Sequence, residues 1–251
     1  MRFHYLFLFW LMVFALFSCA EKDPERNNKI ALEPRNDLYV IMKDFRYALK
    51  PIEVELIDQG LVNIHDLDTT LLVDLKYAGT DNFMGKNVYE GMQNAYLQEE
   101  VARQLVQSQR YLKKIKPGYS LVVFDAARPR RIQQKMWDAL EVSPQEKTKF
   151  LSNPANGSVH NFGAAVDVGL VDEKGELLDM GTPFDHFGEK AHPALEEEML
   201  TDHKIKPVHV ENRQLLRRVM WHGGFWGIQT EWWHFNALTR AQAKEKYSII
   251  E

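Results

Sequence analysis

The chain has 251 residues, of which 45% are hydrophobic and 26% are charged, and its formal net charge is −4. This is the composition of an ordinary globular protein, and the length suits one domain with a substantial core plus some appended sequence. No stretch is strongly basic, so nucleic acid is not an expected partner.

The first 18 residues differ in character from the rest of the chain. Arg2 is followed by a largely apolar run over residues 3–17. A bilayer-spanning helix needs about 20 apolar residues, so this shorter run with a basic start is typical of a secretion signal. The run ends in Leu-Phe-Ser-Cys19, which resembles the bacterial lipobox. That resemblance implies cleavage before Cys19 and lipid modification of its side chain; a plain apolar cysteine, or a later cleavage point, is the alternative.

Cys19 is the only cysteine, so no intrachain disulfide can form and any metal site must use His, Asp and Glu. We interpret residues 19–59 as a lipidated N-terminus, a polar tether and a helix over residues 37–49 that Pro51 would end. Residues 60–251 are expected to form the folded body.

The body alternates between strand and helix patterns without regular βαβ order. Residues 79–89 read as a loop. Strands are predicted at residues 71–77, 119–124, 164–171 and 230–236, and helices at residues 98–115, 131–140, 213–222 and 240–247, the last capped by Thr239. This order favours the α+β class, with a central antiparallel or mixed sheet covered by helices.

Two short segments carry the chemistry. The first is Ser158-Val-His160-Asn-Phe-Gly-Ala-Ala-Val-Asp167, and the second is Glu231-Trp-Trp-His234-Phe. His160, Asp167 and His234 offer two imidazole nitrogens and one carboxylate oxygen. A catalytic zinc site uses three such protein ligands and leaves one position for water.

The strand pattern over residues 164–171 gives Asp167 a definite setting. The apolar residues of this segment share one face, and Asp167 points to the other face between Ala165 and Gly169. Two small neighbours are expected to leave room for a ligand beside the carboxylate.

Glu231 and Arg128 are candidates for catalysis. Residues three apart on a regular strand point to opposite faces, so Glu231 needs a twist, a bulge or the strand's end to reach the same water as His234. A carboxylate placed there could move a proton. Arg128, held before Pro129 at a strand end, could stabilise an oxyanion; a solvated helix start is the alternative for this arginine.

The pattern Ser-x-His-x-x-Gly-x-Ala-x-Asp, followed by Glu-x-x-His, resembles the zinc D,D-peptidases that share their fold with the signalling domain of hedgehog. More narrowly, the chain resembles the D-alanyl-D-alanine dipeptidases known from vancomycin resistance. Supporting stretches lie at residues 74–78, 81–85, 127–129 and 180–185. The resemblance runs from about Gly60 to the C-terminus, and the aromatic residue common in the family before the arginine is Ala127 here.

The resemblance implies one Zn²⁺ per chain, with His160, Asp167 and His234 as ligands and Glu231 as general base and acid. It implies that Arg128 stabilises the transition state. It further implies that Asp185 holds the substrate's ammonium group and that Ser158 lines the pocket.

We therefore expect zinc-dependent hydrolysis of D-Ala-D-Ala in cell-wall peptide turnover, at the cell envelope and anchored to a membrane through Cys19. One alternative is a D,D- or L,D-carboxypeptidase or endopeptidase that acts on peptidoglycan stem peptides. The other is a non-catalytic envelope-binding lipoprotein. The sequence does not indicate an oligomeric state.

Overall fold

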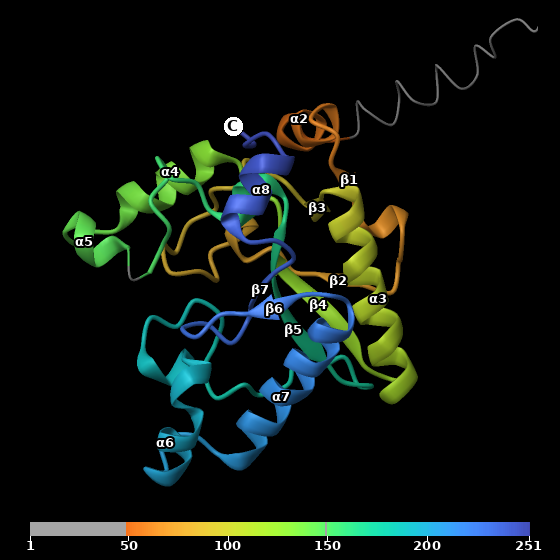
Figure 1. Cartoon of the computed structure of the whole chain (residues 1–251), viewed down its shortest axis with the longest axis vertical. Coiled ribbons are helices and arrows are strands. Elements are labelled where there is room, and N and C mark those ends of the chain that lie inside the picture. The colour runs from red at the N-terminus through yellow and green to blue at the C-terminus, as the bar shows by residue number, and fades with distance from the viewer. Residues whose placement is uncertain (1–48, 149) are drawn as a thin grey trace, which may run out of the picture. The chain divides into compact units, whose positions relative to one another are not determined.

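The computed structural model describes residues 49–148 and 150–251 (Figure 1). The predicted signal segment, Cys19 and the tether lie outside these residues, as does the helix predicted at residues 37–49, apart from Leu49, which lies in a bend. Within the described part of the chain, no helix is both long enough and apolar enough to cross a membrane.

The described elements confirm the α+β class. The α-helices are α2 (Pro51–Asp58), α3 (Glu99–Ile115), α4 (Arg130–Ala139), α5 (Pro144–Lys147), α6 (Glu196–Thr201), α7 (Pro207–His222) and α8 (Arg240–Lys246). The strands are β1 (Val62–Asn63), β2 (Leu72–Val73), β3 (Tyr96–Leu97), β4 (Ser120–Asp125), β5 (Ala165–Val171), β6 (Trp226–Gly227) and β7 (His234–Asn236).

The central sheet is mixed, which is one of the two arrangements that the sequence predicted, antiparallel or mixed. Its five strands run in the order β2-β4-β5-β7-β6, with β2 parallel to β4 and the other neighbours antiparallel. The short strands β1 and β3 form a separate antiparallel pair. Helix α3 contacts β4, α7 contacts β5, and the two helices pack against each other beside the sheet (Figure 1).

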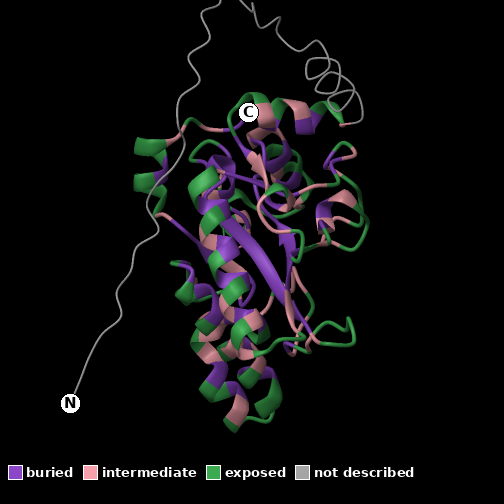
Figure 2. Ribbon diagram, turned by 90° about the vertical axis from the view of Figure 1, so that its right-hand side faces the viewer, coloured by how far each residue is buried: buried purple, intermediate pink, exposed green. Residues whose placement is uncertain are grey.

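The central strands are buried and the outer faces of the helices are exposed (Figure 2). All seven residues of β5 are buried, and its polar member, Asp167, is only 3% exposed. The amphipathic pattern of α3 explains its position, because Val101, Leu105 and Leu112 lie on its buried face. The core also includes Ile52 from α2.

Two predicted strands are shorter than expected. Only Leu72–Val73 pairs within residues 71–77, because the chain then turns into a 3-10 helix, Lys76–Ala78, whose Tyr77 stays buried. In residues 230–236 only His234–Asn236 is a strand. Helix α7 begins at Pro207 rather than at 213, since proline fits the first turn of a helix.

A β-bulge in β4 decides which face Asp125 occupies. The register of β4 on β5 shifts between Val123 and Asp125, so that Asp125 lies opposite Asp167. Without this shift Asp125 would point to the other face of the sheet. The ring of Phe124 packs so closely on Gly169 that a methyl group there would meet its Cζ at 2.7 Å. The space expected beside Asp167 at Gly169 is therefore filled by Phe124.

Candidate active site

The register between β5 and β7 brings two of the candidate ligands together. Asp167 on β5 lies directly opposite His234 on β7, and residues opposite each other in an antiparallel pair share a face of the sheet. The Asp167 Oδ1 and His234 Nδ1 atoms are 3.0 Å apart. A pairing between strands that are 67 residues apart along the chain therefore forms half of the site.

His160 reaches the same point from the 3-10 helix Val159–Phe162, which precedes β5. Ser158 caps this turn, since its Oγ accepts a hydrogen bond from the backbone N–H of His160 at 3.4 Å. Gly163 ends the turn with φ of +63°, a conformation that suits glycine. A side chain at Gly163 would also press on Leu61 and on the backbone of Gln98.

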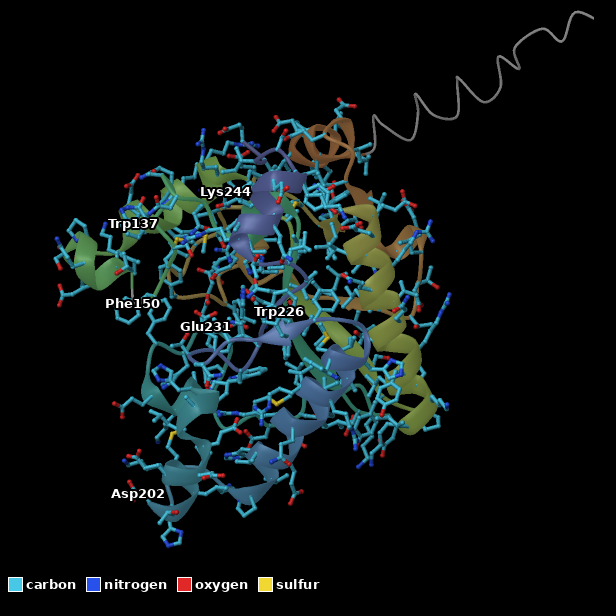
Figure 3. All side chains as sticks on the ribbon, viewed as in Figure 1. Trp137, Phe150, Asp202, Trp226, Glu231 and Lys244 are labelled. Atoms are coloured by element: carbon cyan, nitrogen blue, oxygen red, sulfur yellow. The ribbon has the colours of Figure 1, made fainter. Side chains whose placement is uncertain are left out.

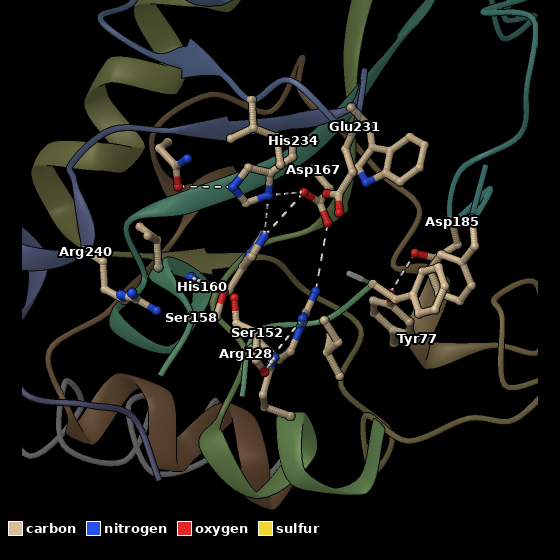
Figure 4. Close-up of a pocket in the computed structure, with 18 residues that line it drawn as sticks. Tyr77, Arg128, Ser152, Ser158, His160, Asp167, Asp185, Glu231, His234 and Arg240 are labelled. Atoms are coloured by element: carbon tan, nitrogen blue, oxygen red, sulfur yellow. Dashed lines mark hydrogen bonds and ion pairs between the residues drawn. The ribbon is translucent and has the colours of Figure 1, made fainter. Parts of the chain in front are cut away.

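Hydrogen bonds on the far side of each ring orient the two imidazoles. His160 Nδ1 lies 2.7 Å from the carbonyl oxygen of Ala126, and His234 Nε2 lies 3.1 Å from Oδ1 of Asn236. Because both partners are hydrogen-bond acceptors, those ring nitrogens carry the protons. The lone pairs of His160 Nε2 and His234 Nδ1 then face each other at 3.1 Å (Figure 4).

The Oδ1 atom of Asp167 completes this group, 3.3 Å from His160 Nε2. Burial alone would raise the pKa of Asp167, whereas positive charge on the neighbouring imidazoles, when they are protonated, would hold it below its ordinary value. Two lone pairs and a carboxylate at such separations repel one another unless a cation lies between them. Within residues 49–148 and 150–251, His160, Asp167 and His234 are the group whose spacing suits a metal ion.

Glu231 lies before β7 rather than on it. The rule that residues three apart on a strand point to opposite faces therefore does not apply to Glu231 and His234. Its side chain and His234 line the same cavity (Figure 4). Burial raises the pKa of Glu231 to about 7, and the negative charges of Asp167 and Asp185 add to the effect. A carboxyl group with such a pKa can both take and return a proton near neutral pH.

Arg128 is buried and its guanidinium is held on two sides. Its Nε donates to Asp125 Oδ2 at 2.8 Å, its Nη2 donates to the same oxygen, and its Nη1 donates to Gln133 Oε1 at 2.8 Å. Burial by itself would lower the pKa of Arg128, but Asp125 holds it above its ordinary value. The centroid of the Tyr77 ring lies 5.1 Å from Cζ of the Arg128 guanidinium. Arg128 therefore has an aromatic neighbour, although the residue that precedes it is the buried Ala127 and not an aromatic one.

Asp185 stands on the far side of the cavity with φ of +59°, in the left-handed region. Aspartate tolerates this conformation better than most residues. Its Oδ1 accepts a hydrogen bond from the Tyr77 hydroxyl at 2.9 Å, and the N–H of Phe83 approaches Oδ2 at 3.5 Å. Burial raises the pKa of Asp185 to about 7, against the opposing effect of the Tyr77 hydrogen bond.

One cavity of about 380 Å³ is lined by all seven candidate residues of the folded body. They are Arg128, Ser158, His160, Asp167, Asp185, Glu231 and His234. Cys19 lies outside the described residues.

The sequence interpretation did not assign four residues that support these side chains: Tyr77, Asp125, Gln133 and Asn236. One of them had a visible signal, because Tyr77 lies in a stretch that carried the family resemblance, and Asp125 stands only three residues before Arg128. Gln133 and Asn236 had none, since their roles depend on which side chains the fold brings within hydrogen-bonding distance.

Three convergent atoms that could bind a metal ion, a carboxyl group and a fixed cation around one cavity are the groups that a metal-dependent hydrolase uses. Residues 58–250 match the family described as D-ala-D-ala dipeptidase, Peptidase_M15. The chain belongs to this family and is a peptidase.

Curated relatives agree with this assignment. The D-alanyl-D-alanine dipeptidase of Escherichia coli K12 is 35% identical over 175 residues, which cover 70% of this chain and 83% of the relative. The D-alanyl-D-alanine dipeptidase of Enterococcus faecium is 31% identical over 178 residues, which cover 64% of this chain and 83% of the relative.

Among solved structures, the chain is similar to the vancomycin resistance D,D-pentapeptidase VanY, solved in complex with Zn(II). Its TM-score is 0.36 at 15% identity, and the match covers 61% of this chain and 79% of that one. The LD-carboxypeptidase LdcB scores 0.37 at 18% identity, with coverage of 60% and 63%. Scores this low establish no shared substrate.

Asn236 provides a test of the site that leaves the three candidate ligand side chains in place. Asn236→Ala removes the acceptor that orients His234, so the affinity for a divalent metal ion should fall by about 10–100-fold. Competition with a chromophoric chelator measures this affinity. Asn156→Ala, at an exposed loop position, is the control and should leave it unchanged. Equal metal affinity in the two variants would contradict the role given to Asn236.

Proposed function

We propose that the chain is a zinc-dependent dipeptidase that hydrolyses D-Ala-D-Ala to two D-alanines. The observation that carries this proposal is the cavity itself, which joins a three-ligand group to Glu231 and Arg128 at one side and Asp185 at the other. The substrate named for the relatives supports the same conclusion.

Zinc fits the donor set of His160, Asp167 and His234. Their ligand atoms are separated by 3.0, 3.1 and 3.3 Å. Tetrahedral zinc with bonds of about 2.0–2.1 Å requires its ligands to lie about 3.3 Å apart. When bound, the ion would supply a Lewis acid and make water acidic enough to ionise near neutral pH.

Glu231 is proposed as the group that moves the proton. As a carboxylate it accepts the proton of the attacking water, and as a carboxylic acid it returns that proton to the leaving amine. A pKa raised to about 7 by burial suits both halves of this cycle. Its position outside β7 leaves the side chain able to approach the cavity.

Arg128 is proposed to stabilise the negative oxygen that develops on the substrate carbonyl. A guanidinium has five N–H groups, and three nitrogen atoms of Arg128 each donate to Asp125 or Gln133. One N–H on each terminal nitrogen is therefore not used by Asp125 or Gln133. Nη2 also lies 3.9 Å from Asp167 Oδ2, so Nη1 is the better placed of the two for the substrate. Because the group is already held in place, little reorganisation is needed when charge develops.

Asp185 is proposed to bind the free ammonium of the dipeptide. Ser158, which lines the same cavity next to His160, is proposed to contact the substrate at the other end (Figure 4). A buried carboxylate pays a desolvation cost that a bound ammonium would offset. Recognition of this charged end, together with attack at the adjacent amide, restricts the site to short substrates.

The substrate comparison tests the activity. The wild-type chain should hydrolyse D-Ala-D-Ala and should act poorly on L-Ala-D-Ala-D-Ala, because the longer peptide has no ammonium at Asp185. Glu231→Gln should lower kcat by about 10²–10⁴-fold, since it removes the proton carrier. Chelation should abolish activity and Zn²⁺ should restore it, with D-alanine release as the measurement.

The control for this experiment is Glu197→Gln, an exposed change on α6 that should leave kcat unaltered. Activity on the tripeptide alone would instead favour the carboxypeptidase alternative. Full activity after verified removal of zinc would contradict the metal proposal. No hydrolysis of either peptide by a zinc-loaded chain would favour the non-catalytic alternative.

Asp185 also predicts how KM depends on pH. Only its carboxylate can pair with the ammonium, so KM for D-Ala-D-Ala should rise as pH falls through a value at or below about 7. KM should rise again above about pH 8, where the α-amino group of the substrate loses its proton. Inhibition by N-acetyl-D-Ala-D-Ala, which has no ammonium, should lack both dependences, and a KM for the dipeptide that is constant across this range would contradict the role of Asp185.

We further propose that the enzyme acts at the cell envelope, anchored by a lipid on Cys19, and turns over cell-wall dipeptides there. The basis is the lipobox-like end of the N-terminal apolar run. Cys19→Ser should move the protein out of the membrane fraction, whereas wild type should sediment with membranes and incorporate labelled palmitate. A wild-type protein found in the cytosol would contradict this proposal.

A further inference from the structure

A second cavity adjoins the active site. Its volume is about 470 Å³, and it lies beyond a wall that the two cavities share. The residues that line both cavities are Phe150, Phe187, Glu231 and Trp233. Phe150 and Glu231 lie near each other in the view of Figure 3. The wall separates the proposed dipeptide site from a space that the proposed reaction does not use.

Phe150 and Phe187 bring two loops together in this wall, and Phe83 from a third loop, which lines neither cavity, packs against Phe187. The rings of Phe150 and Phe187 are 4.8 Å apart between centroids, and those of Phe83 and Phe187 are 5.0 Å apart. Phe187 is 40% exposed, so its ring borders solvent as well as the two cavities. A row of rings from separate loops at the mouth of a cavity is a barrier built from side chains, so single substitutions can open it.

The barrier stands close to the group that would hold the ammonium of the substrate. Phe187 follows Asp185 by two residues, and the N–H of Phe83 approaches the Asp185 carboxylate. His186, which lies between Asp185 and Phe187, lines only the second of the two cavities. A peptide that continues beyond the ammonium position must therefore pass the rings to enter the second cavity.

The second cavity has the chemistry to receive a peptide unit. Besides the shared wall, it is lined by Thr148, His186, Gly188, Glu189, His192 and Thr230. Hydroxyl, imidazole and carboxylate groups can satisfy the N–H and C=O groups of an added residue.

We propose that the Phe150–Phe187 pair is the specificity-determining barrier of this peptidase. It ends the substrate pocket beside Asp185 and excludes peptides extended at the N-terminus, and the second cavity accepts the added residue when the pair is opened. This inference rests on the proposed function. It adds selection by the length of the substrate to the recognition of the substrate's ammonium by Asp185.

The test compares kcat/KM for L-Ala-D-Ala-D-Ala with kcat/KM for D-Ala-D-Ala. Phe187→Ala should raise the ratio of tripeptide to dipeptide by about tenfold or more, the scale on which shape discriminates between substrates. Phe150→Ala removes the same contact from the other loop and should raise the ratio as well. Mass spectrometry should identify L-Ala-D-Ala and D-Ala as the tripeptide products.

Two variants serve as controls. Phe187→Tyr keeps a ring in the barrier and should keep the wild-type ratio. Trp221→Ala removes an aromatic side chain that is 74% exposed on α7, away from both cavities, and should also keep it. Thermal melting of each variant checks that the comparison is made on folded protein.

The outcomes separate this inference from the proposed function. An unchanged ratio in both alanine variants, with an active wild type, would overturn the barrier and leave the dipeptidase intact. A wild type that already cleaves the tripeptide as well as the dipeptide would also overturn the barrier. A wild type that leaves D-Ala-D-Ala uncut would defeat the proposed function itself.

Discussion

The register of three neighbouring strands is the constraint on which the site depends. Asp167 lies opposite Asp125 on one side and opposite His234 on the other, so one row across β4, β5 and β7 carries all three side chains. A slip of one residue in either pairing would turn part of this row to the other face of the sheet. The bulge in β4 is what places Asp125 in the row, and Asp125 in turn holds Arg128.

The buried charges of the site stabilise one another in a chain. Asp125 accepts hydrogen bonds from Arg128 and from the hydroxyl of Tyr89, while Arg128 also lies 3.9 Å from Asp167. Removing one member would leave an uncompensated buried charge, which is far more costly than the loss of an exposed ion pair. The same burial raises the pKa values of Glu231 and Asp185. Folding therefore raises the pKa values of Glu231 and Asp185 and also holds Arg128 in one position.

The two ends of the cavity have different origins. Secondary structure supplies the end with the metal-ligand group, through β5, β7 and the turn that Ser158 caps. Loops supply the end with Asp185, where the aromatic row of Phe83, Phe187 and Phe150 lies. Strands hold side chains rigidly and loops tolerate change. The candidate ligands Asp167 and His234 stand on strands, while Arg128 and Glu231 lie just outside them. We infer that the selection of substrate length belongs to the loops.

The sequence by itself determined the class of fold, the helices α3, α4 and α8 within about a residue, and the candidate residues, because these depend on local periodicity, capping and motif spacing. It overestimated the strands at residues 71–77 and 230–236, because alternation of apolar residues continues where strand pairing stops. Only the tertiary structure decided that Glu231 lies outside β7, that Phe124 fills the space over Gly169, and that Asn236 and Gln133 orient the site. The physical reason is that strand register and contacts between distant segments depend on the packing of the whole sheet, which no local pattern encodes.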